Sequence, residues 1–136
     1  MLQHLQVKNF AIIDSVQISF KDGLNIISGE AGAGKSILLR SLSLLMGGKS
    51  TQDMIRSGAE QATIEGLFDI SKRSDIQEKL SSLGIDSDEK TLIVKRIFQS
   101  SGKGKVFINS SLSTLNDLVE IISPLVEITS DSAPLI

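Results

Sequence analysis

The chain of 136 residues is long enough for one domain with a single hydrophobic core. Its 14 basic and 16 acidic residues give a net charge of −2, which excludes a strongly basic nucleic-acid module. Without any cysteine, disulfide scaffolds, thiolate metal sites and cysteine nucleophiles are excluded as well. Because the sequence contains neither a run of about 18 apolar residues nor a secretory signal, we expect no membrane span and a cytoplasmic protein.

The N-terminal half predicts strands, a glycine-rich loop and a helix. Apolar and polar residues alternate over residues 16–20, which is the period of a half-buried strand. A turn and a short buried strand at residues 24–28 follow. The largely apolar segment 36–46 predicts a helix packed against a sheet, and Gly47-Gly48 is expected to cap its C-terminal end.

The C-terminal half predicts short strands and two more helices. Strands are expected at residues 64–70, 92–97, 106–108 and 125–129. The glycine-containing turn after the second of these joins it to the third as an antiparallel hairpin. The helices are expected at residues 75–83 and from an N-cap at Ser113 to residue 122, with Pro124 ending the latter.

The glycine-rich loop matches the phosphate-binding pattern G-x-x-x-x-G-K-[ST] at every constrained position, between a predicted strand and a predicted helix. Small residues allow successive backbone N–H groups to surround a β-phosphate, and the helix N-terminus adds the positive end of its dipole. The side chain of Lys35 is expected to bind the β- and γ-phosphates, and that of Ser36 to ligate Mg²⁺. The predicted nucleotide-binding residues are Gly29, Glu30, Ala31, Gly32, Ala33, Gly34, Lys35 and Ser36.

Hydrolysis needs more than phosphate binding, because a P-loop ATPase also requires a strand that ends in an acidic residue and a group that activates water. The sequence has no segment of four apolar residues followed by Asp-Glu. Asp69 comes nearest, but it is more simply the end of an edge strand, and Glu127 fits an exposed position of an alternating strand. We therefore expect no complete catalytic site in this chain.

Segments beyond the loop resemble the N-terminus of the RecN family, which are bacterial DNA double-strand-break repair ATPases of the SMC-like, ABC-type class. The matching segments include Val7–Asp14 and the loop with its helix start, Gly29–Leu38, and the most particular ones are Lys8–Asp14 and Ile55–Glu60. The similarity runs from Met1 to about Ile128. The resemblance implies an α/β fold, that of a P-loop NTPase in the form of the N-terminal lobe of an ABC/SMC-type head, with a mixed sheet and an antiparallel β portion.

The family resemblance also implies cofactors and partners. The cofactors would be ATP and Mg²⁺, with ATP held between two heads of a homodimer. A C-terminal lobe of the same protein would supply a coiled coil, a signature motif, an acidic metal-binding strand and a catalytic glutamate. We therefore expect residues 1–136 to be one lobe and a fragment of a longer, nucleoid-associated protein that acts on double-stranded DNA. The tail Thr129–Ile136 departs from the family, which usually has a glutamine there that helps to hold Mg²⁺ and the attacking water.

By the same resemblance, Lys8 and Asn9 are candidates to lie near the adenine or ribose, and Arg56 near the nucleotide and DNA. Exposed surface side chains are the alternative interpretation for each. His4, the only histidine, is expected to be a surface or strand residue and no metal ligand.

A group of cations surrounds the predicted hairpin and is a candidate for contacts with DNA phosphates, although a solvated hairpin tip would have the same composition. Its members are Lys95, Arg96, Lys103 and Lys105.

Two other functions fit the loop. A small P-loop kinase would use it for phosphoryl transfer, but would usually need a lid with several arginines and an acidic residue that orients the substrate, and the sequence shows neither clearly. A binding-only module would sense nucleotide through dimerisation. Binding of ATP, GTP and ADP, followed by an assay of phosphate release, distinguishes the three functions.

Overall fold

The structure is a computed structural model that describes residues 2–19, 33–49, 54–86, 90–125, 127–128 and 134–135. Its strands are β1 (Leu2–Phe10), β2 (Ile13–Ser19), β3 (Gln61–Asp69), β4 (Thr91–Gln99), β5 (Gly104–Ile108), β6 (Ser111–Ser113), β7 (Glu127–Ile128) and β8 (Pro134–Leu135). Its helices are α1 (Ala33–Leu45), α2 (Ser74–Ser82), α3 (Leu115–Ile122) and the short 3₁₀ helix Ser123–Leu125.

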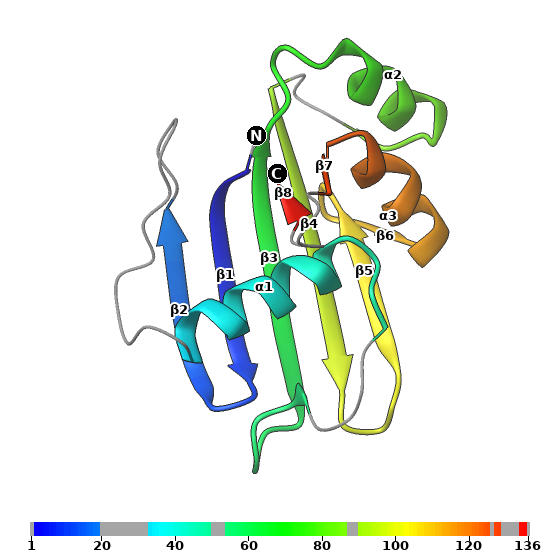
Figure 1. Cartoon of the computed structure of the whole chain (residues 1–136). Coiled ribbons are helices and arrows are strands. Elements are labelled where there is room, and N and C mark those ends of the chain that lie inside the picture. The colour runs from blue at the N-terminus through cyan, green and yellow to red at the C-terminus, as the bar shows by residue number, and fades with distance from the viewer. Residues whose placement is uncertain are drawn as a thin grey trace.

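Six of the strands form one sheet in the order β2-β1-β3-β4-β5-β6, and every neighbouring pair is antiparallel (Figure 1). This sheet is the antiparallel portion of the predicted α/β fold. The predicted β4–β5 hairpin is confirmed, and β6 extends it by a further short strand that the sequence did not predict. The predicted strand at residues 24–28 lies outside the described residues.

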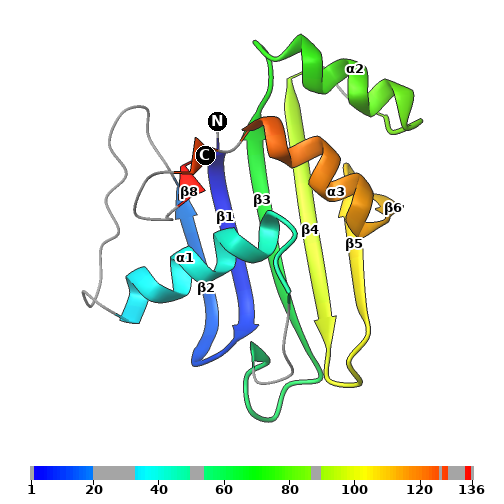
Figure 2. The ribbon, with the colours of Figure 1, turned by 45° about the vertical axis from the view of Figure 1, so that its right-hand side comes forward.

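One face of the sheet is apolar and is covered by helices. The buried residues of β3 alternate along the strand, and those of β4 do the same in register with them, as Ile64 opposite Arg96 illustrates. Figures 1 and 2 show α1 and α3 on this face, where α1 contacts β3 and β4 and α3 contacts β5. Part of this core is formed by Leu5, Phe10, Leu44, Leu45, Ile64, Phe68, Leu92, Ile108 and Leu118, which are at most 1% exposed.

Helix α1 confirms the helix predicted after the glycine-rich loop, and its C-terminal end is closed by backbone hydrogen bonds. The N–H of Gly48 donates to the carbonyl of Ser43 over 3.0 Å, and the N–H of Gly47 donates to that of Leu44 over 3.1 Å. This pair of bonds is a Schellman motif, and Gly47 has the positive φ, 99°, that the motif requires. The predicted cap at Gly47-Gly48 is therefore confirmed.

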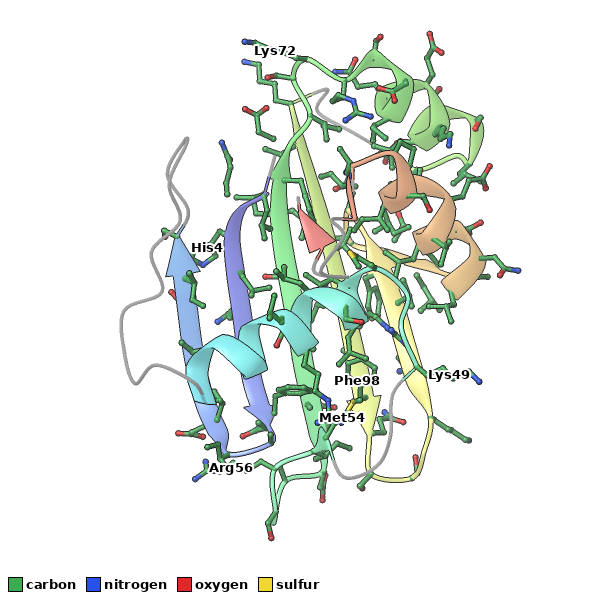
Figure 3. All side chains as sticks on the ribbon, viewed as in Figure 1. His4, Lys49, Met54, Arg56, Lys72 and Phe98 are labelled. Atoms are coloured by element: carbon green, nitrogen blue, oxygen red, sulfur yellow. The ribbon has the colours of Figure 1, made fainter. Side chains whose placement is uncertain are left out.

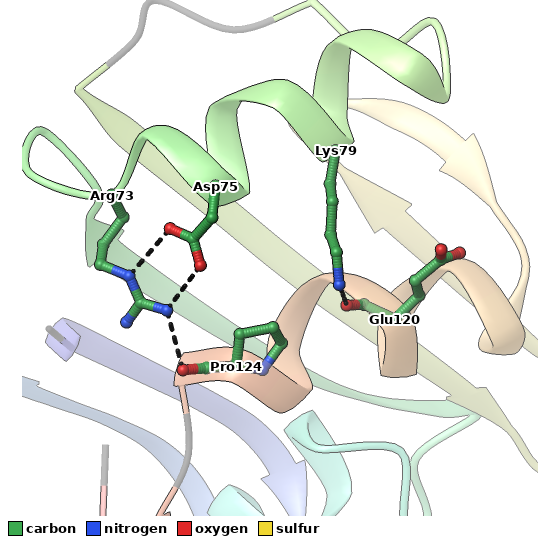
Figure 4. Close-up of polar contacts among 5 residues, drawn as sticks. All are labelled: Arg73, Asp75, Lys79, Glu120 and Pro124. Carbon is green, nitrogen blue, oxygen red and sulfur yellow. Dashed lines mark hydrogen bonds and ion pairs between the residues drawn. The ribbon is translucent and has the colours of Figure 1, made fainter.

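Helix α2 is fastened to the C-terminal end of α3 by two cations (Figure 4). Arg73, just before α2, forms an ion pair with Asp75 at 2.9 Å and also donates to the carbonyl of Pro124 over 2.9 Å. Lys79 donates to the carbonyl of Glu120 over 3.2 Å. Both cations thus neutralise the partial negative charge at the end of α3, which stabilises a helix.

Two predicted boundaries in the C-terminal segment are wrong. Ser113 is the last residue of β6, and the N-cap of α3 is Thr114, whose hydroxyl oxygen accepts from the N–H of Asp117 over 3.1 Å. The strand expected at residues 125–129 is confirmed at Glu127–Ile128, which pair with β8, but Leu125 belongs to the 3₁₀ helix. Of the helices in the described ranges, none has the length and apolar character needed to cross a bilayer.

Candidate nucleotide-binding site

The predicted phosphate-binding loop leads directly into α1. Gly29, Glu30, Ala31 and Gly32 lie outside the described residues. The backbone of Ala33, Gly34, Lys35 and Ser36 forms the first turn of α1, while the side chains of these four residues are outside the described part. The helix therefore begins inside the motif, and the predicted contacts of Lys35 with phosphates and of Ser36 with Mg²⁺ stay predictions.

The first turn of α1 has the electrostatic character of an anion site. An α-helix leaves the N–H groups of its first turn without helical partners, and the helix dipole adds a partial positive charge there. The turn contains Lys35 and no acidic residue, so it carries no carboxylate that would repel a phosphate. Both views of the ribbon place this end of α1 on the β2 side of the sheet and the opposite end toward β3 and β4, which α1 contacts (Figures 1 and 2).

The opposite end of α1 is bound to β4 by Arg96. One nitrogen of its guanidinium, Nη1, donates to the carbonyls of Leu44 and Gly48, both over 2.8 Å. The guanidinium carbon also lies 4.7 Å from the ring centre of Phe98, within reach of a cation–π interaction. Arg96 is only 8% exposed, and this burial lowers its pKa. The prediction that Arg96 belongs to a DNA-binding cationic group is therefore wrong, because its charge points into the protein.

The other members of that cationic group lie on the surface. Lys103 and Lys105 are exposed at the β4–β5 hairpin, and Lys95 is half-buried on the sheet face opposite α1, next to Glu65 of β3. His4 has its Nδ1 atom 3.2 Å from the hydroxyl oxygen of Ser19.

The three residues singled out by family resemblance come from two segments that meet at one end of the sheet. The N–H of Arg56 donates to the carbonyl of Asn9 over 2.8 Å, so these two residues are joined through their backbones. Asn9 has a φ of 54°, in the left-handed region, where β1 turns into β2. Lys8 precedes it as an exposed residue of β1. Figure 3 shows Arg56 at the foot of β1 and β2.

An ion pair that the sequence reasoning missed holds the side chain of Arg56. Its Nη1 atom lies 2.8 Å from Oδ1 of Asp14, and the two side chains are 44% and 78% exposed. Asp14 lies in one of the two most family-specific segments and Arg56 in the other, yet no sequence spacing indicates that they meet. Arg56 is thus directed by a carboxylate at the surface of the hairpin.

Known proteins resemble this chain in sequence and in fold. A family model described as an AAA domain matches residues 4–136. The chain is 40% identical over 128 residues to the DNA repair protein RecN of Halalkalibacterium halodurans, covering 94% of this chain and 23% of that protein. It is 38% identical over 121 residues to RecN of Bacillus subtilis, covering 89% of this chain and 21% of the relative. The chain thus spans less than a quarter of the length of these curated relatives.

Among solved structures, an SMC ATPase from work on ATP-driven dimerization and DNA-stimulated activation superposes with a TM-score of 0.73. It is 22% identical, and the match covers 90% of this chain and 77% of that one, so the likeness concerns the fold. The predicted P-loop NTPase head fold and the resemblance to the RecN family are confirmed by these matches. Because the family model covers nearly the whole sequence, the chain belongs to the AAA domain family.

Proposed function

We propose that the chain binds ATP and Mg²⁺ through residues 29–36 and forms the N-terminal lobe of a RecN-like DNA double-strand-break repair ATPase. The observation that carries this proposal is that α1 begins at Ala33, within the phosphate-binding motif. A 13-residue helix then presents its N-terminal N–H groups and its dipole to the loop. In this proposal, the loop backbone surrounds the β-phosphate, Lys35 binds the β- and γ-phosphates, and Ser36 ligates Mg²⁺.

In the same proposal, hydrolysis needs a C-terminal lobe and a second head. A P-loop ATPase needs an acidic metal-binding strand and a group that activates water, and the sequence has no four-residue apolar segment followed by Asp-Glu. The length of the RecN relatives supports a larger protein, since the chain covers only 23% and 21% of the two compared. Its partners would be that lobe, a second copy and double-stranded DNA, at the nucleoid in the cytoplasm.

The end of the sheet at which β1 turns into β2 is the proposed second contact region. Asn9 and Arg56 are joined there through their backbones, and Lys8 is exposed beside them. A lysine, an amide and a guanidinium suit the ribose, base and phosphate groups of a nucleotide or of DNA. The pairing of Arg56 with Asp14 supports an oriented rather than a freely rotating guanidinium at this surface.

The test is a titration of the chain with a fluorescent ATP analogue in the presence of Mg²⁺, compared with GTP and ADP analogues. Lys35→Ala is expected to abolish triphosphate binding, since it removes the cation proposed for the γ-phosphate. Lys49→Ala is the matched control, because Lys49 is an exposed lysine just beyond the other end of α1. Equal affinity of Lys35→Ala and the unchanged protein would disprove the assignment of the loop.

A phosphate-release assay on the same protein tests the second half of the proposal. We expect binding without steady-state turnover, and turnover once a C-terminal lobe is supplied in trans. Steady-state hydrolysis by the chain alone would contradict the need for a second lobe while leaving the nucleotide site in place.

A further inference from the structure

We propose that Arg96 is a positioning residue for the nucleotide site: it fixes the C-terminal end of α1 to β4 and thereby sets where the first turn of α1, which contains the last four residues of the phosphate-binding motif, lies. The inference rests on the proposed nucleotide binding through residues 29–36. Arg96 is a residue of β4 that contacts the C-terminal end of α1, whereas the motif is at the N-terminal end. We assign Arg96 no contact with nucleotide.

The contacts of Arg96 converge on the last turn of α1. Its Nη1 atom bonds to the carbonyls of Leu44 and Gly48, which lie on either side of the Schellman turn. A cation is favoured at this end of a helix by the dipole, and charge-assisted hydrogen bonds are the stronger kind. The ring of Phe98 covers the guanidinium from β4. The result is a bond between strand and helix that is both charged and shielded from water.

Close packing around this turn leaves the end of α1 little freedom to shift. A Cβ atom at Gly47 would lie 2.5 Å from Cγ2 of Val119, so the turn touches α3 directly. A Cβ atom at Gly66 of β3 would lie 2.9 Å from Cδ1 of Leu45. Arg96 is thus the polar part of an anchor whose apolar part is formed by α3 and β3.

The anchor bears on the first turn of α1 because a helix of this length behaves as a rigid rod. Its 13 residues span about 20 Å, and a helix of that length transmits a shift at one end to the other. A shift of the last turn would therefore move the first turn as well.

If Arg96 served only to stabilise the fold, we would expect an apolar residue at this position. Arg96 shares a buried row on β4 with Leu92, Val94 and Phe98, where an apolar side chain would pack without a desolvation cost. Replacing buried ionic groups by well-packed apolar ones is often neutral or stabilising. The guanidinium supplies what an apolar side chain does not, namely donors aimed at two particular carbonyls of α1.

The experiment compares nucleotide affinity in three variants of the full chain. Arg96→Met keeps the unbranched stem but removes the donors, and Arg96→Lys keeps the charge and one donor group. Leu80→Ala is the stability control, because Leu80 is fully buried in α2 and has no part in the anchor. All are titrated with a fluorescent ATP analogue at a temperature at which thermal unfolding shows each of them folded.

We expect Arg96→Met to bind about tenfold more weakly, as when the competent position of the loop is populated in only about a tenth of the molecules. Arg96→Lys should recover part of the affinity, and Leu80→Ala should keep it despite a lower melting temperature. Unchanged affinity of Arg96→Met, with binding abolished in Lys35→Ala, would overturn the role of Arg96 and leave the proposed function intact. If Arg96→Met does not fold, Arg96→Lys and Leu80→Ala give the same comparison.

Amide hydrogen exchange separates a failure of this inference from a failure of the proposed function. In the absence of nucleotide, the amides of residues 33–38 should exchange faster in the Arg96 variants than in Leu80→Ala. Should the unchanged chain bind no nucleotide, the proposed function is wrong, and this measurement still decides whether Arg96 controls the first turn of α1. Equal exchange in the two kinds of variant would contradict the anchor.

Discussion

The guanidinium of Arg56 lies 2.8 Å from the carboxylate of Asp14 and joins the segment before β3 to the β1–β2 hairpin. Two backbone hydrogen bonds join the same two segments. The N–H of Ala11 donates to the carbonyl of Met54 over 2.6 Å, and the N–H of Arg56 donates to that of Asn9 over 2.8 Å. The backbone hydrogen bonds thus connect the two segments, and the ion pair in addition orients the side chain of Arg56.

Asp14→Asn should therefore change the free energy of unfolding by less than about 1 kcal/mol, because exposed ion pairs contribute little. The difference from the unchanged chain should shrink further at high salt, since salt screens exposed charges. Urea denaturation at low and high ionic strength measures both effects. A large, salt-independent loss of stability would show that the pair holds the two segments together.

Gly47→Ala should destabilise the protein by about 1 kcal/mol or more, because the φ of 99° disfavours a side chain and the added Cβ meets Val119. Gly58→Ala is the control for the backbone effect alone, since Gly58 has a φ of 87° and no atom within 4 Å of the added Cβ. Gly47→Ala should cost more than Gly58→Ala in denaturant unfolding. Combining it with Val119→Ala should restore part of the difference.

Thr114→Ala should cost about 1 kcal/mol of stability, because it removes from the start of α3 the hydroxyl oxygen that accepts from the N–H of Asp117. Ser113→Ala is the neighbouring control, as the Ser113 hydroxyl donates to the carbonyl of Ser111 in β6 and caps no helix. Chemical denaturation of both variants compares them directly. A greater loss with Ser113→Ala would favour the N-cap expected from the sequence.

Acid should weaken the attachment of α2 through Asp75. The guanidinium of Arg73 lowers the pKa of the Asp75 carboxyl, so protons bind this group more tightly in the unfolded chain than in the folded one. Its contribution is therefore fully present above the unfolded pKa of about 3.9 and is lost as the pH falls through the lower, folded pKa.

The measurement is the melting temperature of the unchanged chain and of Asp75→Asn between neutral pH and about pH 3. The advantage of the unchanged chain should diminish toward the acidic end, as the Asp75 carboxyl takes up a proton and loses its charge. Asp86→Asn, at an exposed position beyond α2, is the control. An Asp75→Asn difference that stays constant with pH would rule out the ion pair as its cause.

The cations that remain exposed at the β4–β5 hairpin give a prediction for the larger protein that we propose. Replacing Lys103 and Lys105 by glutamine should weaken binding to double-stranded DNA. It should also lower the slope of log affinity against log salt by up to about two units, roughly one for each phosphate that a lysine no longer neutralises. Fluorescence anisotropy over a salt series measures the slope. An unchanged slope would leave the hairpin tip as merely solvated surface.

Local patterns predicted the elements whose causes are local. The helix after the glycine-rich loop and its end at Gly47-Gly48 follow from apolar composition and from the positive φ that glycine permits. The β4–β5 hairpin follows from alternation on either side of a glycine-rich turn. The N-cap differed by one residue, because the pairing of Ser113 with Val106 of β5 keeps Ser113 in a strand and leaves the cap to Thr114.

Contacts between distant segments were not predictable in this way. Arg96 occupies the same alternating positions of the sequence as Leu92 and Val94, which is a signal for its burial, but its charge favoured a surface interpretation. Only the position of α1 over β4 shows that two backbone carbonyls are placed to accept hydrogen bonds from the guanidinium. The pairing of Arg56 with Asp14 likewise depends on how β1 and β3 lie side by side.

The two cations that fasten α2 have a consequence for how this protein tolerates change. Arg73 and Lys79 bond to the main-chain carbonyls of Pro124 and Glu120, which every amino acid provides. Replacing the side chain at position 120 therefore leaves the acceptor for Lys79 in place. The α2–α3 attachment can persist while the exposed residues of α3 diverge, so natural variants should retain positive charge at positions 73 and 79 more strictly than any particular residue at position 120.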